Sequence, residues 1–227
     1  MDPQLTLYMP DPASLRVIEC SPPSWMIQLA LEEKELPYET RLLSFSAGEH
    51  RSPEMLARNP RGTVPVLTDG PIALYESFAI LEYLEFAYPD PPLLPGTQAL
   101  RALALTRLHE SSHLKSAGMD LFSYLMKTRG LDLDPEAVNR LAVAFHDELF
   151  YWEYYYGVGN FAAGSQASLA DFSVFTYLAT AVHLGLPLDE RYPNLGRFYE
   201  RMKQRISVVT SWPPWKTAPY RYLAETV

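Results

Sequence analysis

Two short stretches of this 227-residue chain combine residue types suited to holding an extended, charged ligand. Val64-Pro65 opens an apolar run, and a cis bond before proline costs little compared with any other cis peptide and turns the backbone sharply. At such a turn the N–H and C=O of Val64 can face outward and pair with an extended ligand. Glu76-Ser77 opens a predicted helix, whose N-terminus favours a carboxylate. The two stretches therefore predict a site for an extended molecule with a carboxylate end.

A predicted hairpin and helix position these residues. Asn59 to Gly62 has the composition of a loop, and two apolar runs follow it, Val64 to Leu67 and Ile72 to Tyr75. The turn Asp69-Gly70-Pro71 lies between the runs, and this pattern predicts a β-hairpin. A helix then begins at Glu76, with apolar residues at helical spacing.

The whole stretch from Asn59 to Leu84 resembles the glutathione-binding half of cytosolic glutathione transferases. The matching residues are Asn59-Pro60, Gly62, Val64-Pro65-Val66-Leu67, Asp69-Gly70, Glu76-Ser77, Ala79-Ile80 and Tyr83-Leu84. On this resemblance the chain is identified as a member of that superfamily, in a serine-type class. It implies an α/β N-terminal thioredoxin-like domain plus an all-α C-terminal helical domain, which is the glutathione transferase fold.

The order of predicted elements agrees with such a fold. Trp25 to Glu35 reads as the crossover helix that a parallel strand pair needs, and Tyr38 to Leu43 reads as the next strand. Tyr88 to Thr97 contains four prolines and a glycine, which is typical of a linker. We therefore predict a glutathione-binding domain over residues 1–88 and an all-helical domain, forming the electrophile pocket, over residues 98–227.

Two alternatives remain for the first strand. Gln4 to Tyr8 reads as a strand, and so does Leu15 to Glu19. In the family, the first strand leads into the catalytic loop within a few residues, whereas a longer segment separates Tyr8 from Ser21 here. Either this chain has an insertion after Tyr8, or Leu15 to Glu19 is the first strand.

By resemblance, the catalytic group sits at the N-terminus of the first helix, near the glutathione sulfur. Aligning the helix that includes Trp25 places Ser21 at that position, in a Ser-Pro-x-Ser arrangement. A free thiol has a pKa of about 8.5 and is mostly protonated at neutral pH. A hydroxyl hydrogen bond plus helix-end N–H groups would favour the thiolate.

Other side chains compete with Ser21 for this role, namely Tyr8, Ser14, Cys20 and Ser24. Tyrosine-type classes use a tyrosine at the end of the first strand, and Ser14 lies in a short serine motif. Classes with a catalytic cysteine form mixed disulfides with glutathione, so Cys20 would imply reduction. Ser24, like Ser21, can also be a simple helix cap.

The resemblance also implies the groups that bind the two substrates. Ser77 suits the γ-glutamyl carboxylate of glutathione, Glu76 suits its ammonium, and Val64-Pro65 suits its main chain. His50 and Arg51 resemble the basic pair that holds the glycine carboxylate in some classes. The residues expected to contact the electrophile are Met119, Phe122 and Tyr124. We predict no metal site, because the histidines are scattered.

The implied reaction is conjugation of glutathione thiolate to a largely apolar electrophile, a detoxification reaction. The alternatives are glutathione-dependent isomerisation, dehalogenation, ether cleavage or thiol transfer, or a non-catalytic ligand-binding role. The family's two-fold contact implies a homodimer, with Phe78, Phe86 and Tyr88 near the interface. A net charge of −8 argues against nucleic acid or an anionic membrane as partner, and the single cysteine suits a cytoplasmic location.

Overall fold

The computed structural model describes residues 4–128, 133–215 and 222–223, and these form two compact units. The first unit contains the described residues up to Leu15 together with Glu19–Leu93 and Ile206–Pro214. The second contains Arg16–Ile18, Leu94–Arg205 and the described residues from Trp215 onward. The chain thus leaves the first unit within the predicted linker and returns to it near the C-terminus.

The first unit is built on a mixed four-stranded sheet with the strand order β2-β1-β3-β4. Its strands are β1 (Leu5–Pro10), β2 (Tyr38–Leu43), β3 (Val66–Asp69) and β4 (Ile72–Tyr75), and its first three helices are α1 (Pro22–Glu33), α2 (Pro53–Arg58) and α3 (Ser77–Ala87). Strand β1 pairs with β2 in parallel and with β3 antiparallel, and β3 pairs antiparallel with β4. The predicted α/β thioredoxin-like architecture is confirmed.

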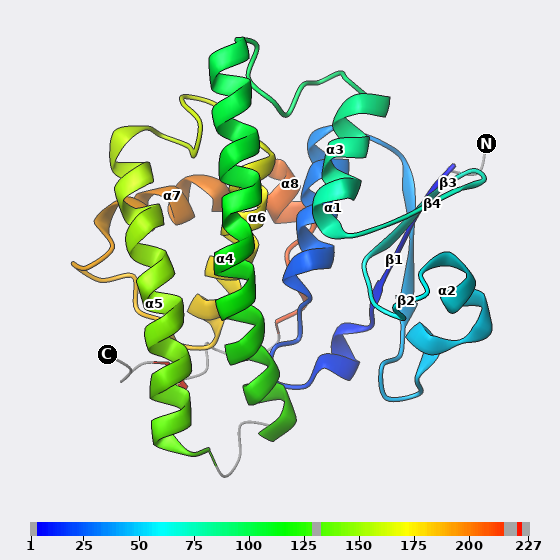
Figure 1. Ribbon diagram of the computed structural model, residues 1–227, viewed down its shortest axis with the longest axis horizontal. Coiled ribbons are helices and arrows are strands. Elements are labelled where there is room, and N and C mark those ends of the chain that lie inside the picture. Colours follow the sequence, from blue (N-terminus) through cyan, green and yellow to red (C-terminus); the bar gives the residue numbers. More distant parts are fainter. Residues whose placement is uncertain (1–3, 129–132, 216–221, 224–227) are drawn as a thin grey trace. The chain divides into compact units, whose positions relative to one another are not determined.

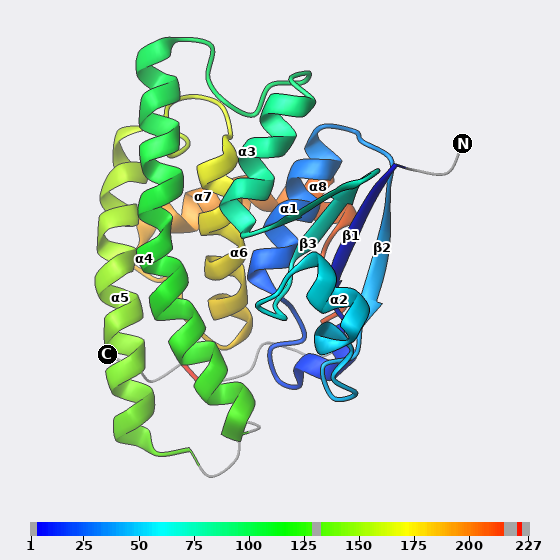
Figure 2. The same ribbon diagram turned by 45° about the vertical axis from the view of Figure 1, so that its right-hand side comes forward.

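Helices cover both faces of this sheet. Side chains alternate between the two faces along each strand, so each strand contributes residues to both layers. Leu7 and Met9 are buried on one face of β1. Tyr8 points to the other face, where the Arg58 guanidinium of α2 lies 5.1 Å from its ring centroid. In Figure 2, α1 and α3 lie on one side of the sheet and α2 on the other.

The segment between β1 and α1 decides between the two alternatives for the first strand. Leu15 to Glu19 forms no strand: a 3-10 helix covers Pro12–Leu15, and Arg16 and Glu19 have φ angles of 57° and 49°. Strand β1 already pairs with β2 on one side and β3 on the other, so no place in the sheet remains beside it. Gln4 to Tyr8 is therefore the correct assignment, and a segment that contains the 3-10 helix leads from β1 to α1.

The second unit is all-helical (Figure 1). Its helices are α4 (Gln98–Thr128), α5 (Pro135–Val158), α6 (Leu169–His183) and α7 (Pro193–Lys203). Helix α6 is apolar almost all round and packs against α4 and α7, as expected for a helix buried inside a bundle. Gly118 lets α4 come close to its neighbours, because a Cβ there would lie 2.9 Å from Cδ1 of Tyr177. No described helix is long and apolar enough to cross a membrane.

A short C-terminal helix, α8 (Ile206–Thr210), completes the first unit and was not predicted from the sequence. It packs against α1, where the Thr210 hydroxyl donates to a Glu32 carboxylate oxygen at 3.1 Å. The Ser207 hydroxyl donates to Glu33 on the same helix. Just beyond α8, the Ser211 hydroxyl oxygen accepts a hydrogen bond from Nε1 of Trp25 at 2.9 Å.

Lys34, at the C-terminal end of α1, is a buried cation that holds the start of the linker. Its Nζ donates to the carbonyl oxygens of Tyr88 and Pro91, at 2.7 and 2.9 Å. It also forms an ion pair of 2.8 Å with Glu85 of α3. Three oxygens therefore compensate a charge whose side chain has no exposed surface.

Candidate active site

The register of the sheet brings the predicted binding segments to one end of it. The last residues of the parallel strands, Pro10 of β1 and Leu43 of β2, are paired. Val66, which begins β3, pairs with Tyr8 near the end of β1 and with Tyr75 at the end of β4. Four segments therefore lie at the same end of the sheet: those that follow β1, β2 and β4, and the one that precedes β3.

Ser21 is the N-cap residue of α1, but its hydroxyl makes no capping hydrogen bond. The next two residues, Pro22 and Pro23, have no N–H to donate to it. The N–H groups of Ser24 and Trp25 both donate to the Ser21 carbonyl oxygen instead, at 2.9 and 2.8 Å. The N–H groups of the first four helical residues of α1 are therefore absent or already used within the helix, and the Ser21 hydroxyl is the candidate donor to a thiolate.

The Ser21 side chain is half-buried, and its Oγ lies 3.0 Å from Oγ of Ser24. Ser24 is fully buried in the first turn of the helix. A partly exposed serine and a fully buried one thus face each other through their hydroxyls.

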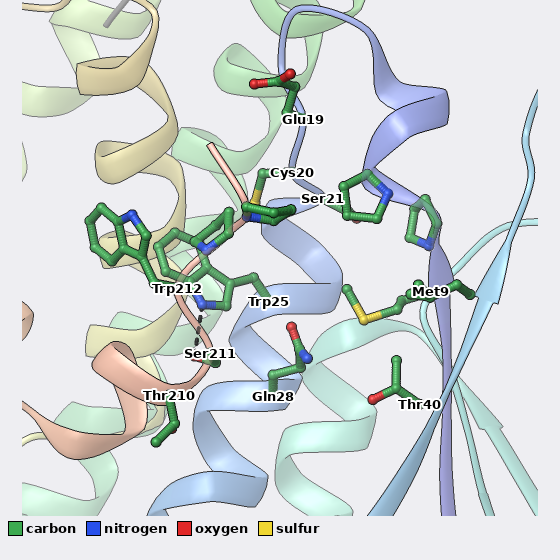
Figure 3. A pocket seen from close by; sticks show the side chains of 15 residues that line it. Met9, Glu19, Cys20, Ser21, Trp25, Gln28, Thr40, Thr210, Ser211 and Trp212 are labelled. Carbon is green, nitrogen blue, oxygen red and sulfur yellow. Dashed lines mark hydrogen bonds between the residues drawn. The ribbon is translucent and has the colours of Figure 1, made fainter. Parts of the chain in front are cut away.

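A cavity of about 190 Å³ opens beside Ser21 (Figure 3). Its walls come from the end of β1, from β2, from the first turns of α1 and from the segment after α8, and they include Met9, Pro10, Pro12, Trp25, Leu42, Trp212, Pro213 and Pro214. Trp25 and Trp212 meet edge to face with ring centroids 5.6 Å apart. Gln28 and Thr40 add polar groups to this mainly apolar surface. The cavity suits a small apolar ligand that offers one or two hydrogen-bonding groups.

The other candidate donors lie in different surroundings. The Ser14 hydroxyl donates to the Asp11 carbonyl oxygen at 2.6 Å, within the 3-10 turn. Tyr8 faces α2, on the opposite side of the sheet from Met9, which lines the cavity. Cys20 lines the cavity next to Ser21 and is 6% exposed. Among the five candidates, Ser21 combines the N-cap position with an accessible hydroxyl.

The Val64-Pro65 peptide bond is cis, the isomer that the sequence made inexpensive at this position. Pro65 is buried and Val64 is half-buried. Within the described residues, the main-chain N–H and C=O of Val64 make no hydrogen bond to another main-chain group. A short extended ligand can therefore pair with them in the manner of an added strand.

Glu76 and Ser77 stand at the start of α3, directly after β4. Glu76 has φ 72° and ψ 112°, a conformation that residues other than glycine rarely adopt and that costs about 1–3 kcal/mol. Its carboxylate lies 4.0 Å from the Arg61 guanidinium, with both side chains exposed. Ser77 is 3% exposed and is the first residue of the helix.

His50 and Arg51 lie in the 3-10 helix Glu49–Arg51, which follows β2. His50 stacks on Phe45 with ring centroids 4.1 Å apart, and its buried Nδ1 has no hydrogen-bond partner among the described residues. Burial and the neighbouring Arg51 charge lower the pKa of His50. The Cγ atom of Arg51 passes close to Gly62, where an added Cβ would lie 3.1 Å from it.

Comparison with known proteins identifies the family to which this chain belongs. The glutathione S-transferase N-terminal domain model matches residues 20–86, and the C-terminal domain model matches residues 141–210. Glutathione S-transferase A of Pleuronectes platessa is 39% identical over 88% of this chain and 91% of its own length. This chain belongs to the glutathione S-transferase family.

Two solved glutathione transferases have similar structures. A glutathione S-transferase of the Antarctic clam Laternula elliptica is 33% identical, with a TM-score of 0.82 over 97% of this chain and 98% of the clam protein. The Phanerochaete chrysosporium transferase URE2P6, solved in complex with oxidized glutathione, is 25% identical, with a TM-score of 0.80 over 92% and 95%. The glutathione transferase fold and family predicted from the sequence are therefore confirmed.

The three residues predicted to contact the electrophile lie on α4 of this transferase, in the second unit. Phe122 is 1% exposed and its ring packs in the helical core, with centroids 6.0 Å from Phe145 and 6.3 Å from Tyr177. Met119 is half-buried. Tyr124 is half-buried too, and its hydroxyl oxygen accepts a hydrogen bond from the Asp134 N–H at 3.0 Å. Their role in binding the electrophile stays a prediction.

Sequence reasoning did not name Gln28 and Thr40 of the transferase as lining residues. Their signal was present in the residue spacing. Gln28 lies three residues after Trp25, so both share one face of α1. Thr40 pairs with the buried Leu7 and therefore faces the same side of the sheet as α1.

Proposed function

We propose that this glutathione transferase uses glutathione as its co-substrate and conjugates the thiolate to a small, mostly apolar electrophile. The observation that carries the proposal is the Ser21 hydroxyl, which sits at the N-terminus of α1 without a capping partner and beside an apolar cavity. A donor in this position stabilises the sulfur anion and leaves it nucleophilic. The apolar walls of the cavity support an apolar second substrate.

In the proposed mechanism, four groups of residues share the work. Ser21 donates a hydrogen bond to the sulfur, and the thiol proton leaves to solvent. The main chain of Val64, preceding Pro65, pairs with the middle of the tripeptide. Glu76 and Ser77 bind the ammonium and carboxylate of its γ-glutamyl end, where the N-terminus of α3 adds a favourable field for an anion. His50 and Arg51 hold the glycine carboxylate.

Replacement of Ser21 by alanine tests this mechanism. A hydrogen bond to a charged group contributes about 1.5–3 kcal/mol, so Ser21→Ala should lower kcat with a chlorodinitrobenzene about 10- to 100-fold. The KM for glutathione should change little, because the sulfur contact does not involve the ends of the tripeptide. Ser14→Ala is the matched control, since that hydroxyl bonds to Asp11 and should leave the rate at the wild-type value.

Two other outcomes would point to different functions. If Ser21→Ala keeps the wild-type rate while Cys20→Ser abolishes disulfide reduction by glutathione, then the protein is a thiol transferase. Cys20 lines the same cavity, which is why this reaction is the second candidate. If the wild-type protein binds glutathione but catalyses none of the family's reactions, a ligand-binding role replaces catalysis.

We further propose a cytoplasmic homodimer that acts in detoxification. The predicted contact on α3 is supported by Phe86, whose side chain is 87% exposed in the single chain. A two-fold contact would bury this ring twice over. Light scattering at micromolar concentration should give twice the chain mass of 25.8 kDa. The variant Phe86→Ser should shift the equilibrium toward monomer, and a wild-type mass near that of one chain would refute the dimer.

A further inference from the structure

We infer that Ser24 is a positioning residue for Ser21: its buried hydroxyl donates to Ser21 Oγ and thereby leaves the Ser21 proton free for the sulfur. The inference rests on the proposed function, in which Ser21 holds the thiolate. It adds a second residue and a direction for the hydrogen bond that joins the two hydroxyls at 3.0 Å.

The direction follows from the number of partners available. A hydroxyl has one proton to donate and two lone pairs to accept with. Ser24 is 0% exposed, and within the described part of the chain its Oγ has Ser21 Oγ as its only hydrogen-bond partner. If Ser21 were the donor, the Ser24 proton would be buried without an acceptor, which is unfavourable. Ser24 is therefore the donor and Ser21 the acceptor.

Because of the two prolines in the first turn, no main-chain N–H group of that turn competes with Ser24 for the Ser21 hydroxyl oxygen. In most helices the N-cap oxygen accepts from the main-chain N–H of the second or third helical residue. Here the second is Pro23, which has no N–H, and the N–H of the third, Ser24, goes to the Ser21 carbonyl oxygen. The Ser21 hydroxyl oxygen is thus left to accept from the Ser24 side chain.

Ser21 is half-exposed, so its own proton can point away from the helix toward the ligand. A hydroxyl that accepts one hydrogen bond is a stronger donor in another, because the bonds polarise each other. Ser24 therefore acts on the sulfur only through Ser21. No covalent bond changes: both hydroxyls keep their protons, and the thiol proton leaves to solvent.

The test is a double-mutant cycle read through the thiol itself. The pKa of bound glutathione is measured from the ultraviolet absorbance of the thiolate in the wild type, Ser24→Ala, Ser21→Ala and the double variant. We expect Ser24→Ala to raise that pKa by about half to one unit and to lower kcat about three- to tenfold, with the KM for glutathione unchanged. In the Ser21→Ala background, the Ser24 substitution should change neither quantity.

Further variants separate positioning from folding. Ser24→Cys keeps a side chain of similar shape but supplies only a weak donor, and it should behave like Ser24→Ala. Ser24→Thr keeps the hydroxyl and should retain most of the activity, and thermal melting of each variant checks the fold. An equal loss from Ser24→Ala with and without Ser21 would overturn the inference, as would an unchanged thiol pKa in that variant. A wild-type pKa in Ser21→Ala would instead remove the proposed function and this inference with it.

Discussion

Two glycines on helices of the second unit should respond to alanine in opposite directions. Gly118 lies in the middle of α4, and a Cβ there would be 2.9 Å from Cδ1 of Tyr177 and 3.2 Å from Cε2 of Phe145. Both rings are fully buried and cannot move into solvent. Gly196 lies in α7, where an added Cβ meets nothing within 4 Å.

The expected magnitudes follow from two opposing effects. Alanine in place of glycine within a helix stabilises by about 1 kcal/mol, because it restricts the unfolded chain and favours the helix. At Gly118 this gain is set against overpacking of the core, which costs about 1–3 kcal/mol. Gly118→Ala should therefore lower the free energy of unfolding by up to about 2 kcal/mol. Gly196→Ala, without a clash, should raise it by about 1 kcal/mol.

Urea unfolding followed by circular dichroism measures both variants under the same conditions, and equal slopes with denaturant would show that the midpoints are comparable. The result that contradicts the packing account is a Gly118→Ala protein at least as stable as Gly196→Ala. That outcome would mean that the rings of Tyr177 and Phe145 make room for a methyl group at little cost.

Three further predictions test other features of the structure. Lys34→Met should destabilise the first unit by about 3–5 kcal/mol because it leaves Glu85 without its buried partner, whereas Lys203→Met, at an exposed ion pair, should cost less than about 1 kcal/mol in the same urea experiment. Glu76→Gly should raise the free energy of unfolding by about 1 kcal/mol, because glycine accepts the positive φ of this position. Calorimetry should nevertheless show that this variant binds glutathione more weakly. Glu76→Ala should weaken binding without the gain in stability. Burial lowers the pKa of His183 to about 4, so the unfolded chain binds the proton more tightly than the folded one. The free energy of unfolding should therefore fall by about 3 kcal/mol, relative to that of His183→Phe, as the pH drops from about 6.5 to 4. Equal pH profiles of the two proteins would contradict this.

The central stretch of the first unit was predictable because its signals are local. Hairpin and helix signals between Asn59 and Leu84 each depend on residues a few positions apart. Strand β4 and helix α3 appear where those signals predict them, whereas β3 begins at Val66 and extends through Asp69, two residues beyond the predicted run Val64 to Leu67. The first strand was ambiguous for a reason that is not local. Leu15 to Glu19 has strand-like residues, but β1 already occupies the position between β2 and β3, and Arg16 and Glu19 adopt positive φ angles that do not occur in a regular strand.

The details around Ser21 lay beyond the sequence for a similar reason. The sequence shows Pro22 and Pro23, so the lack of N–H groups at these two positions could be predicted. That Ser24 is fully buried, and that its hydroxyl faces Ser21, depends on what packs over the first turn of α1. Likewise, α8 has only five residues, which is too few for the spacing of apolar residues to predict a helix. Nothing near them in the sequence shows that they pack against α1.

The return of α8 to the first unit has a consequence for how the protein is made. The ribosome completes the sheet, α1 and α3 early, but Ile206–Pro214 emerges only after helices α4 to α7 have been synthesised. Until then Trp25 lacks both Ser211, which accepts its indole N–H, and the ring of Trp212. Domains generally fold from the N-terminus during synthesis, yet part of this first unit follows the second unit in the chain. A nascent chain arrested before Ile206 would therefore leave Trp25 of α1 without these two contacts.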